Sequence, residues 1–483
     1  MPVTAARFSR GEPSRVGSAS WLWIWTGLLA VLLIIFAQAM DANGLLERGA
    51  SWWRPFLTLP AHAVLMYSWW RLAPPALQGR SSGWRHPGWL AAIWSLPMLF
   101  ALPMHSRDLY SYAAQGWLLN HGLDPYLVPS GQAGAPGLLV GVHWYKTTSV
   151  YPALAVQSFG TNSALFGDQV FWAAAGMRLQ GVLALVLLGW CLVRLARRFD
   201  ADPTLALWLG LANPVVLVQW IGGGHNDSVM VALLALAFVV ATSEAASRWP
   251  AVVLAAVALG LAMSFKQSAA LAGLGLVALT WQTQLAAGRR GWGRLAAIAV
   301  VQGAVTVAVF VATSMATGLG FGWNAETAGN PISATSNAPL SWVASFGRYH
   351  ELADFPTVNA VVTAVGLALI VASLVWLYVR FGPRADEPGN PWAFVTLGLL
   401  AFGVLGPAFQ PWYLTWLIPF YLFCGFAPRR DRAALLILIG FALLPALQDI
   451  LPPYIAMEIV AVLLVPLWWH WRRTGFAPLE TAV

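Results

Sequence analysis

Long apolar stretches alternate with short polar segments along almost the whole chain. A helix needs about 20 mostly apolar residues to cross the hydrocarbon core of a bilayer. The pattern predicts an all-α polytopic membrane protein with about 13–14 transmembrane helices. The candidate stretches are approximately 21–39, 52–72, 88–104, 170–193, 204–221, 228–243, 250–265, 268–285, 295–317, 357–379, 391–408, 411–426, 433–447 and 455–471.

Two polar segments are much longer than the others, at about 105–169 and 318–356. Both contain Pro, Gly, Asn and aromatic residues without runs of charge, and we expect both on the extracytoplasmic side. The Arg-rich start and the stretch 21–39 resemble a signal peptide, but the stretch is longer than the usual h-region. We therefore expect a cytoplasmic tail at 1–20, one transmembrane domain at 21–471 and a cytoplasmic tail at 472–483.

Charge supports this topology and excludes other classes. Charged residues make up only 10% of the chain and hydrophobic residues 59%, so a soluble fold has too little polar surface. With a cytoplasmic N-terminus, most of the 27 Lys and Arg fall in inner segments, as the positive-inside rule requires. This explains the net charge of +8 without a nucleic-acid partner. The two cysteines lie in apolar stretches and indicate neither a disulfide framework nor a metal site.

Polar residues at membrane depth are costly and are functional candidates by default. The first cluster follows the third apolar stretch. It predicts a helix from Asp108 to Leu119 on the outer surface, with Asp108 in its first turn and Gly122 ending it. A carboxylate there faces both bilayer and water, which suits a general base. A helix cap paired with Arg107 accounts for Asp108 equally well.

The second cluster lies in a glycine-rich turn between two apolar stretches, Gly222-Gly223-Gly224-His225-Asn226-Asp227. Glycines permit close backbone approach, and such a turn at a helix N-terminus is a good anion site. In this interpretation Asp227 caps the next helix, while His225 and Asn226 point into a cavity. The alternative is a tight turn with a polar cap.

Two more clusters fall at predicted outer helix ends. Lys266 lies between two short apolar stretches, where it either binds a phosphate or extends its ammonium group to water. The segment from Gln410 to Trp416 sets aromatic rings beside polar groups, which suits a sugar face but also an ordinary aromatic belt. Weaker candidates for acceptor contacts in the second long segment are Asn330, Ser333, Asn337 and Arg348.

As a set these motifs resemble the polyprenol-phosphomannose-dependent α-1,6-mannosyltransferases, closest to the MptB type, which are multi-span GT-C glycosyltransferases. The matching pieces recur in order over most of the chain. One departure is Tyr151-Pro152-Ala153-Leu154, where the family pattern has Tyr-Gly-Pro-Leu. The matching pieces are Ser106–Gly116, Gly122–Tyr126, Asn213-Pro214, Gly223–Asp227, Lys266 and Pro411–Tyr413.

The resemblance implies a polyprenyl phosphomannose donor, a mannan or lipoglycan acceptor, contact with membrane lipids, and an active site facing outward from the plasma membrane. It implies no cofactor and no metal. Asp108 is expected to act as the catalytic base. The expected donor-phosphate ligands are Arg107, His225 and Lys266, and the expected sugar or acceptor contacts are Tyr110, Tyr112, Gln115, Asn226, Asp227, Gln410, Trp412 and Tyr413.

Two other functions remain open at this point. One is a GT-C transferase of another lipid-linked sugar, such as arabinose or glucose. The other is a flippase or transporter of a lipid-linked sugar. A transporter would more often carry broken helices in two symmetric halves, whereas these polar residues gather at predicted outer helix ends, which favours an enzyme.

Overall fold

The computed structural model describes residues 18–42, 53–74, 86–167, 169–324, 336–350, 354–406, 408–426 and 428–474. These residues form helices joined by turns, and none of them lies in a β-strand. The described part of the chain therefore confirms the predicted all-α architecture.

Several helices are long and apolar enough to cross a membrane. Within the described ranges seven helices meet this criterion, and a bent pair forms an eighth possible span. The prediction of 13–14 spans also needs shorter helices to cross and stays a prediction. The seven are α1 (Ser18–Ala42), α9 (Val170–Arg198), α14 (Gly273–Ala286) with the preceding turn η5 (Gln267–Ala272), α15 (Trp292–Ala316), α17 (Phe355–Phe381), α20 (Pro428–Gln448) and α21 (Pro453–Thr474). The shorter helices include α2 (Arg54–Arg71), α4 (Pro87–Leu99), α12 (Asp227–Ala241), α13 (Trp249–Phe265) and α18 (Pro391–Leu405).

The apolar stretch 204–221 is not one straight helix. It consists of α10 (Pro203–Gly210) followed by α11 (Pro214–Leu217) and the π-helical turn η3 (Val218–Gly222), with a bend of 48° between the two parts. The break falls at Asn213, whose side chain accepts a hydrogen bond from the Val215 N–H, and at Pro214, which has no N–H to continue the helix.

The prediction of a membrane helix at 411–426 is wrong. That stretch forms three short pieces: η7 (Pro411–Trp416), α19 (Ile418–Tyr421) and η8 (Leu422–Cys424). Pro419 removes an N–H that a continuous helix would need, and Gly425 ends the segment with a φ of +62°. Hydropathy records how apolar the segment is but not these interruptions.

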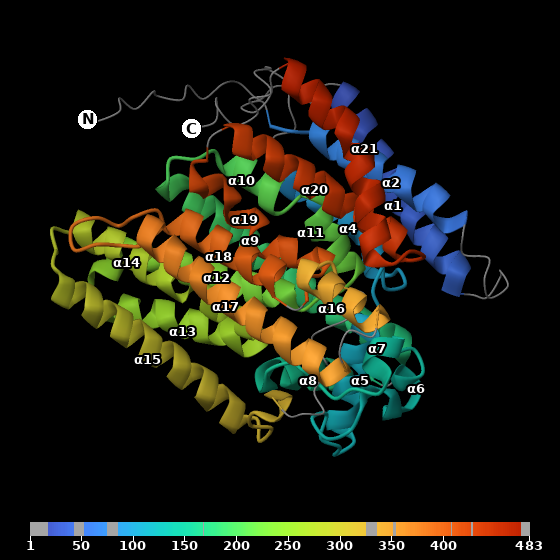
Figure 1. Ribbon diagram of the computed structural model, residues 1–483, viewed down its shortest axis with the longest axis horizontal. Coiled ribbons are helices and arrows are strands. Elements are labelled where there is room, and N and C mark those ends of the chain that lie inside the picture. Colours follow the sequence, from blue (N-terminus) through green and yellow to red (C-terminus); the bar gives the residue numbers. More distant parts are fainter. Residues whose placement is uncertain are drawn as a thin grey trace.

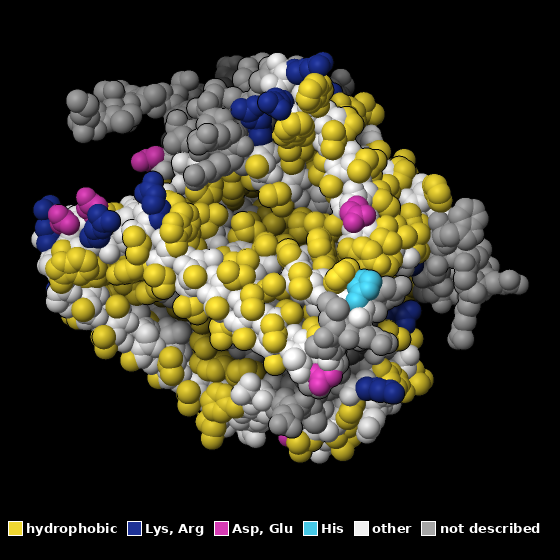
Figure 2. Space-filling model, in the orientation of Figure 1, with side chains coloured by type: hydrophobic (Ala, Val, Ile, Leu, Met, Phe, Trp, Pro, Cys, Tyr) yellow, Lys and Arg dark blue, Asp and Glu magenta, His cyan; other side chains and the backbone are white. Residues whose placement is uncertain are grey.

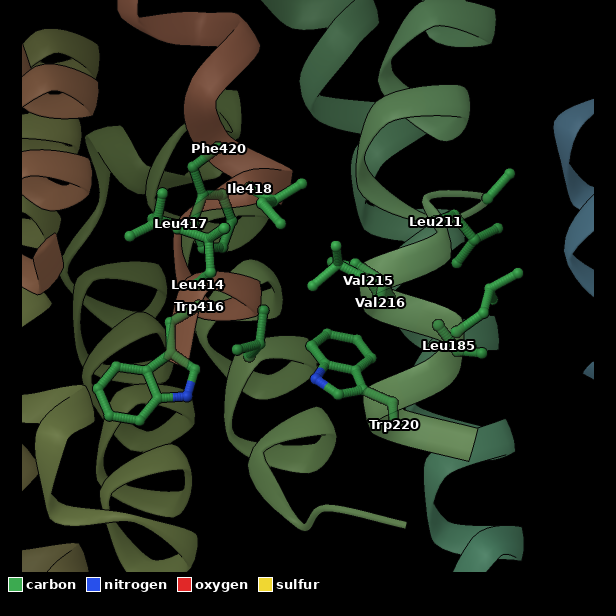
Figure 3. Close-up of a cluster of buried hydrophobic side chains, with 14 of the residues drawn as sticks. Leu185, Leu211, Val215, Val216, Trp220, Leu414, Trp416, Leu417, Ile418 and Phe420 are labelled. Atoms are coloured by element: carbon green, nitrogen blue, oxygen red, sulfur yellow. The ribbon is translucent and has the colours of Figure 1, made fainter. Parts of the chain in front are cut away.

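The two broken segments pack against each other inside the protein. Figure 3 shows Leu414 and Ile418 from the second segment on the side of the first, which carries Val215, Val216 and Trp220. All of these side chains are buried. Irregular backbone at membrane depth is tolerated when protein rather than lipid surrounds it, and this packing meets that condition.

The helices form one assembly around these segments. In Figure 1 the N-terminal helices α1 and α2 lie beside the C-terminal helices α20 and α21, while α13, α14 and α15 occupy the opposite side. Hydrophobic side chains cover most of the face in Figure 2, and charged side chains lie toward its edges. Helices α15, α17 and α21 expose many large apolar side chains, which is the surface expected of a multi-pass membrane protein.

Both long polar segments lie at one end of the molecule (Figure 1). The first, predicted at 105–169, runs from the end of α4 to the start of α9 and is itself largely helical. The second, predicted at 318–356, lies between α15 and α17 and contains α16 (Pro339–Tyr349). The helices of the first segment are α5 (Asp108–Asn120), α6 (Gly134–Gly137), α7 (Val142–Tyr145) and α8 (Ala153–Phe166).

Arg178 on α9 ties the framework helices to this end. Its guanidinium group is fully buried and donates to the carbonyl oxygens of Leu99 and Ala101 after α4, at 3.3 and 2.6 Å. It also donates to the carbonyls of Ile221 and Gly222, at 2.8 and 2.9 Å. The Arg178 side chain thus donates to carbonyl groups at the ends of two segments. It thereby fixes the positions of the two polar clusters that follow these segments relative to each other.

Candidate functional site

The first two polar clusters of the sequence meet at the end of η3. The Met104 N–H donates to the Gly222 carbonyl at 3.1 Å. Gly224 has a φ of +67°, and a β-carbon there would lie 2.3 Å from Cδ1 of Leu109, which is fully buried. The absence of a side chain at Gly224 therefore allows the two segments to pack closely against each other.

We expect Gly224→Ala to reduce both stability and activity. Positive φ costs an L-residue about 1–2 kcal/mol, and forcing a methyl group into a packed core adds about 1–3 kcal/mol. Gly288→Ala is the matched control, because Gly288 has a φ of +75° with no atom within 4 Å of its would-be β-carbon. Thermal unfolding in detergent compares the two. Equal losses of stability would show that contact with Leu109 is unimportant.

Asp108 begins α5, as predicted, and Gly122 follows the end of that helix with a φ of +72°. The Asp108 backbone N–H donates to Ser106 Oγ at 3.1 Å. Its buried carboxylate accepts a hydrogen bond from the Trp144 indole N–H at 2.9 Å, and its other oxygen lies 3.6 Å from Nδ1 of His225. The carboxylate therefore faces Trp144 and His225 rather than acting as a cap paired with Arg107.

His225 is fully buried, and its ring stacks on Trp412 with centroids 3.9 Å apart. Burial lowers the pKa of the imidazole, while the Asp108 carboxylate acts in the opposite direction. Among the described residues, neither ring nitrogen of His225 nor the amide nitrogen of Asn226 has a hydrogen-bond partner. Buried polar atoms are normally paired, so these groups suit contacts to a bound ligand.

The predicted side-chain cap at this turn is not what the structure shows, and two backbone N–H groups of the turn are already hydrogen-bonded within the protein. The Asp227 side chain accepts from Lys266 Nζ at 2.7 Å and from the Trp416 indole N–H, so it forms a buried ion pair instead of a cap. The N–H groups of Gly223 and His225 donate to backbone carbonyls of residues 218 and 219. They are therefore not available to an anion.

Aromatic rings enclose Lys266. Its Nζ lies 4.7 Å from the ring centroid of Tyr413 and 5.1 Å from that of Trp416, and those two rings stack at 4.1 Å. Trp416 is fully buried and Trp412 covers His225. These rings therefore line the protein interior and do not form an interfacial aromatic belt.

Of the other predicted site residues of α5, Tyr112 and Gln115 form hydrogen bonds to residues around the site. The Tyr112 hydroxyl lies 3.2 Å from the Tyr151 hydroxyl and donates to Asn226 Oδ1 at 3.5 Å. Burial raises the pKa of Tyr112 well above its usual range, so it stays a neutral hydrogen-bonding group. Gln115 accepts from Ser149 Oγ at 2.8 Å, and Tyr110 is half-buried.

A cavity of about 450 Å³ opens beside Asp108. It brings together four of the twelve predicted site residues. The other eight are not among the described residues that line it: Tyr110, Tyr112, Gln115, His225, Asn226, Asp227, Lys266 and Tyr413. Sequence reasoning missed Trp144 and Asp449, which are joined to the site only by tertiary contacts. The lining residues include Arg107, Asp108, Gln410 and Trp412 from the prediction, with His105, Trp144, Gln219, Gln448 and Asp449 in addition.

Of the weaker candidates for acceptor contacts in the second long segment, Asn337 alone is found, among the described residues, in contact with a residue that lines the cavity. Asn337 is buried and accepts a hydrogen bond from Gln448, a residue that lines the cavity. Asn330, Ser333 and the side chain of Arg348 lie outside the described residues. In the described part of the chain, no three His, Cys, Asp or Glu side chains gather closely enough to hold a metal ion.

Comparison with known proteins identifies the family. The family model described as alpha-(1→6)-mannopyranosyltransferase, N-terminal domain, matches residues 19–283. The chain belongs to the alpha-(1→6)-mannopyranosyltransferase family. It is 30% identical to alpha-(1→6)-mannopyranosyltransferase A of Mycobacterium tuberculosis, over 84% of this chain and 79% of that protein. It is 31% identical to the A enzyme of Corynebacterium glutamicum, over 67% of this chain and 68% of that protein. It is 28% identical to the B enzyme of the same organism, over 67% of this chain and 56% of that protein.

Membership of the alpha-(1→6)-mannopyranosyltransferase family confirms the predicted resemblance and the fold class, an all-α polytopic GT-C glycosyltransferase. The matched family model ends at residue 283, within α14. The cavity nevertheless takes Gln410, Trp412 and Asp449 from later in the chain. The site is therefore built from both the matched N-terminal part and the C-terminal helices.

Proposed function

We propose that this protein transfers mannose from polyprenyl phosphomannose to an α-1,6-mannan or lipoglycan acceptor at the outer face of the plasma membrane. The observation that carries the proposal is the Asp108 carboxylate, which lines a cavity of about 450 Å³ and is oriented by Trp144. Relatives over most of the chain are named alpha-(1→6)-mannopyranosyltransferases, which supports mannose as the sugar.

In the proposed mechanism Asp108 takes the proton of the acceptor 6-hydroxyl. The resulting oxygen attacks the anomeric carbon of the donor from the face opposite the phosphate, and the bond between that carbon and the phosphate oxygen breaks. A β donor then gives an α product in a single displacement. One carboxylate is enough because the phosphate leaves without a strong acid, so the cavity needs one base and a cation near the phosphate.

Arg107 is the predicted phosphate ligand best placed for this role, because it lines the cavity next to Asp108. Lys266 is held by Asp227 in an ion pair, so we do not assign it to direct contact with the phosphate. Gln410 and Trp412 line the cavity and are proposed to contact the sugar. His225 and Asn226, with their unpartnered nitrogens, lie behind Trp412 and Tyr112 and are proposed to complete the donor pocket.

The membrane accounts for where the reaction takes place. A polyprenyl tail gains about 0.8 kcal/mol for each CH₂ buried in lipid, so the donor stays in the bilayer with its phosphate at the interface. The cavity takes lining residues from α5 and α7, which lie at the end of the molecule that holds both long segments in Figure 1. The distribution of Arg predicts that this end faces the outer side.

The test is transfer of radiolabelled mannose from synthetic polyprenyl phosphomannose to a short α-1,6-mannoside by the purified protein in detergent. We expect a product one mannose longer with an α linkage, identified by NMR. Polyprenyl phosphoarabinose and phosphoglucose are offered in parallel, and transfer from one of these alone would replace mannose as the sugar. Movement of labelled donor across vesicles without any glycan product would instead identify a flippase.

A further inference from the structure

A second cluster of buried polar groups lies on the other wall of the cavity. Asp449 directly follows α20, and its Oδ2 atom pairs with the guanidinium group of Arg54 from the start of α2. The same oxygen lies 3.0 Å from Nδ1 of His105. Arg54 also donates to Gln38 Oε1 on α1 at 3.2 Å. Side chains from α1, α2 and the loop before α5 thus converge on the carboxylate that follows α20.

His105 connects this cluster to the loop that carries Asp108. It lies three residues before Asp108 and has a φ of 58°, a conformation that non-glycine residues adopt rarely and at a cost. Such a conformation persists only where surrounding contacts hold it. The side-chain contact to Asp449 is one of these contacts. Others are the Gln38 amide nitrogen, 3.4 Å from Nδ1 of the imidazole, the ring of His62, with centroids 5.0 Å apart, and the bond from the Met104 N–H to the Gly222 carbonyl.

We infer that Asp449 is a positioning residue for the transfer reaction. Together with Arg54 it fixes His105, and through His105 it sets the backbone that places the Asp108 carboxylate against Trp144. This inference rests on the proposed function for its kinetic consequences. Asp449 itself is a poor base, because one of its oxygens already receives an arginine and an imidazole.

The inference also explains how the C-terminal helices take part in the site. Asp449 lies far beyond the end of the matched family model at residue 283, while Arg54, His105 and Asp108 lie inside it. The pair formed by Arg54 and Asp449 therefore joins α2 to the end of α20, and these helices lie side by side in Figure 1. The C-terminal helices thereby define the geometry of the loop that carries the proposed base.

The experiment compares Asp449→Asn, His105→Asn and the double variant in the mannose-transfer assay. Asparagine tolerates positive φ, so His105→Asn removes the imidazole while sparing the backbone conformation. A misplaced catalytic group costs up to about a hundredfold in rate. We expect each single variant to lower kcat by about ten- to a hundredfold at nearly unchanged donor KM, and the double variant to lose no more than the worse single variant.

Asp431→Asn is the matched control, because Asp431 is a buried carboxylate at the other end of α20 that accepts a hydrogen bond from Tyr421. We expect it to keep the wild-type kcat. If Asp449→Asn does not fold, Asp449→Glu keeps the charge and displaces it by one methylene, and the same fall in kcat is expected. Wild-type kcat in the Asp449 variant, losses that multiply in the double variant, or a rise in KM alone would each overturn the inference.

Hydrogen exchange of the amides at 104–110 separates this inference from the proposed function, because it needs no substrate. We expect faster exchange there in Asp449→Asn and His105→Asn than in the wild type or Asp431→Asn. No mannose transfer by the wild type, together with this faster exchange, would reject the proposed function and keep the positioning role. Transfer by the wild type with unchanged exchange in the variants would reject the positioning role alone.

Discussion

Asp108→Asn is expected to lower the rate of mannose transfer by about 10²- to 10⁴-fold, the usual contribution of a general base. Asparagine keeps the shape of the side chain and can still accept the hydrogen bond from Trp144 through its amide oxygen. The variant therefore removes the proton acceptor while leaving the packing at the start of α5 in place. The measurement is kcat with saturating donor and acceptor, with thermal unfolding as the check on folding.

The matched control for this prediction is Asp386→Asn, which removes an exposed carboxylate between α17 and α18. We expect it to transfer mannose at the wild-type rate. An Asp108→Asn protein that unfolds at the wild-type temperature and retains more than about a third of the wild-type kcat would exclude Asp108 as the base. In that case the mechanism would need a base other than the two carboxylates of the cavity, because Asp449 is already paired with Arg54.

The part of the site that sequence reasoning predicted is the part encoded by local signals. A polar cluster after an apolar stretch, an acidic residue in a first helical turn and a glycine after the last turn together indicate α5, and the structure places that helix at Asp108–Asn120. The boundaries of the two long polar segments follow in the same way from where apolar stretches end. These features depend on neighbouring residues, so one sequence is enough to find them.

The missed features depend on residues that are far apart in the chain. Asp449 and Arg54 are separated by almost the whole transmembrane domain, and each alone looks like an ordinary charged residue at a helix end. Trp144 is one of 28 tryptophans, and nothing in its neighbourhood indicates that its N–H reaches Asp108. The hydropathy of the stretch 411–426 predicts one helix because hydropathy does not report the interruption at Pro419.

For Lys266 and Asp227 the local pattern predicts the position in the fold but not the contacts of the side chains. Both were expected to contact substrate, and the turn and helix end that carry them were predicted from local pattern. The structure pairs the two side chains with each other, at 2.7 Å, where Asp227 is fully buried and the Lys266 side chain is 13% exposed. We therefore expect substitutions at Asp227 and Lys266 to affect the stability of the protein first, because each buried charge is compensated by the other.

Removing either partner of this pair is expected to destabilise the protein by about 3–5 kcal/mol, because the remaining charge stays buried without its counter-ion. Asp227→Asn and Lys266→Met are suitable variants, since the asparagine oxygen can still accept from Trp416 and methionine keeps the length of the lysine chain. We expect the double variant to be much less destabilised than the sum of the two single variants, because replacing both charges leaves no buried ion unpaired.

Unfolding followed in detergent measures these losses, with Glu244→Gln, an exposed carboxylate in the turn η4 (Glu244–Ser247), as the control for removing a charge alone. Additive losses in the double variant would mean that the two side chains act independently. Single variants as stable as the wild type would mean that water reaches the pair and screens it. A coupled loss would instead establish that the ion pair of Asp227 and Lys266 joins the start of α12 to the end of α13.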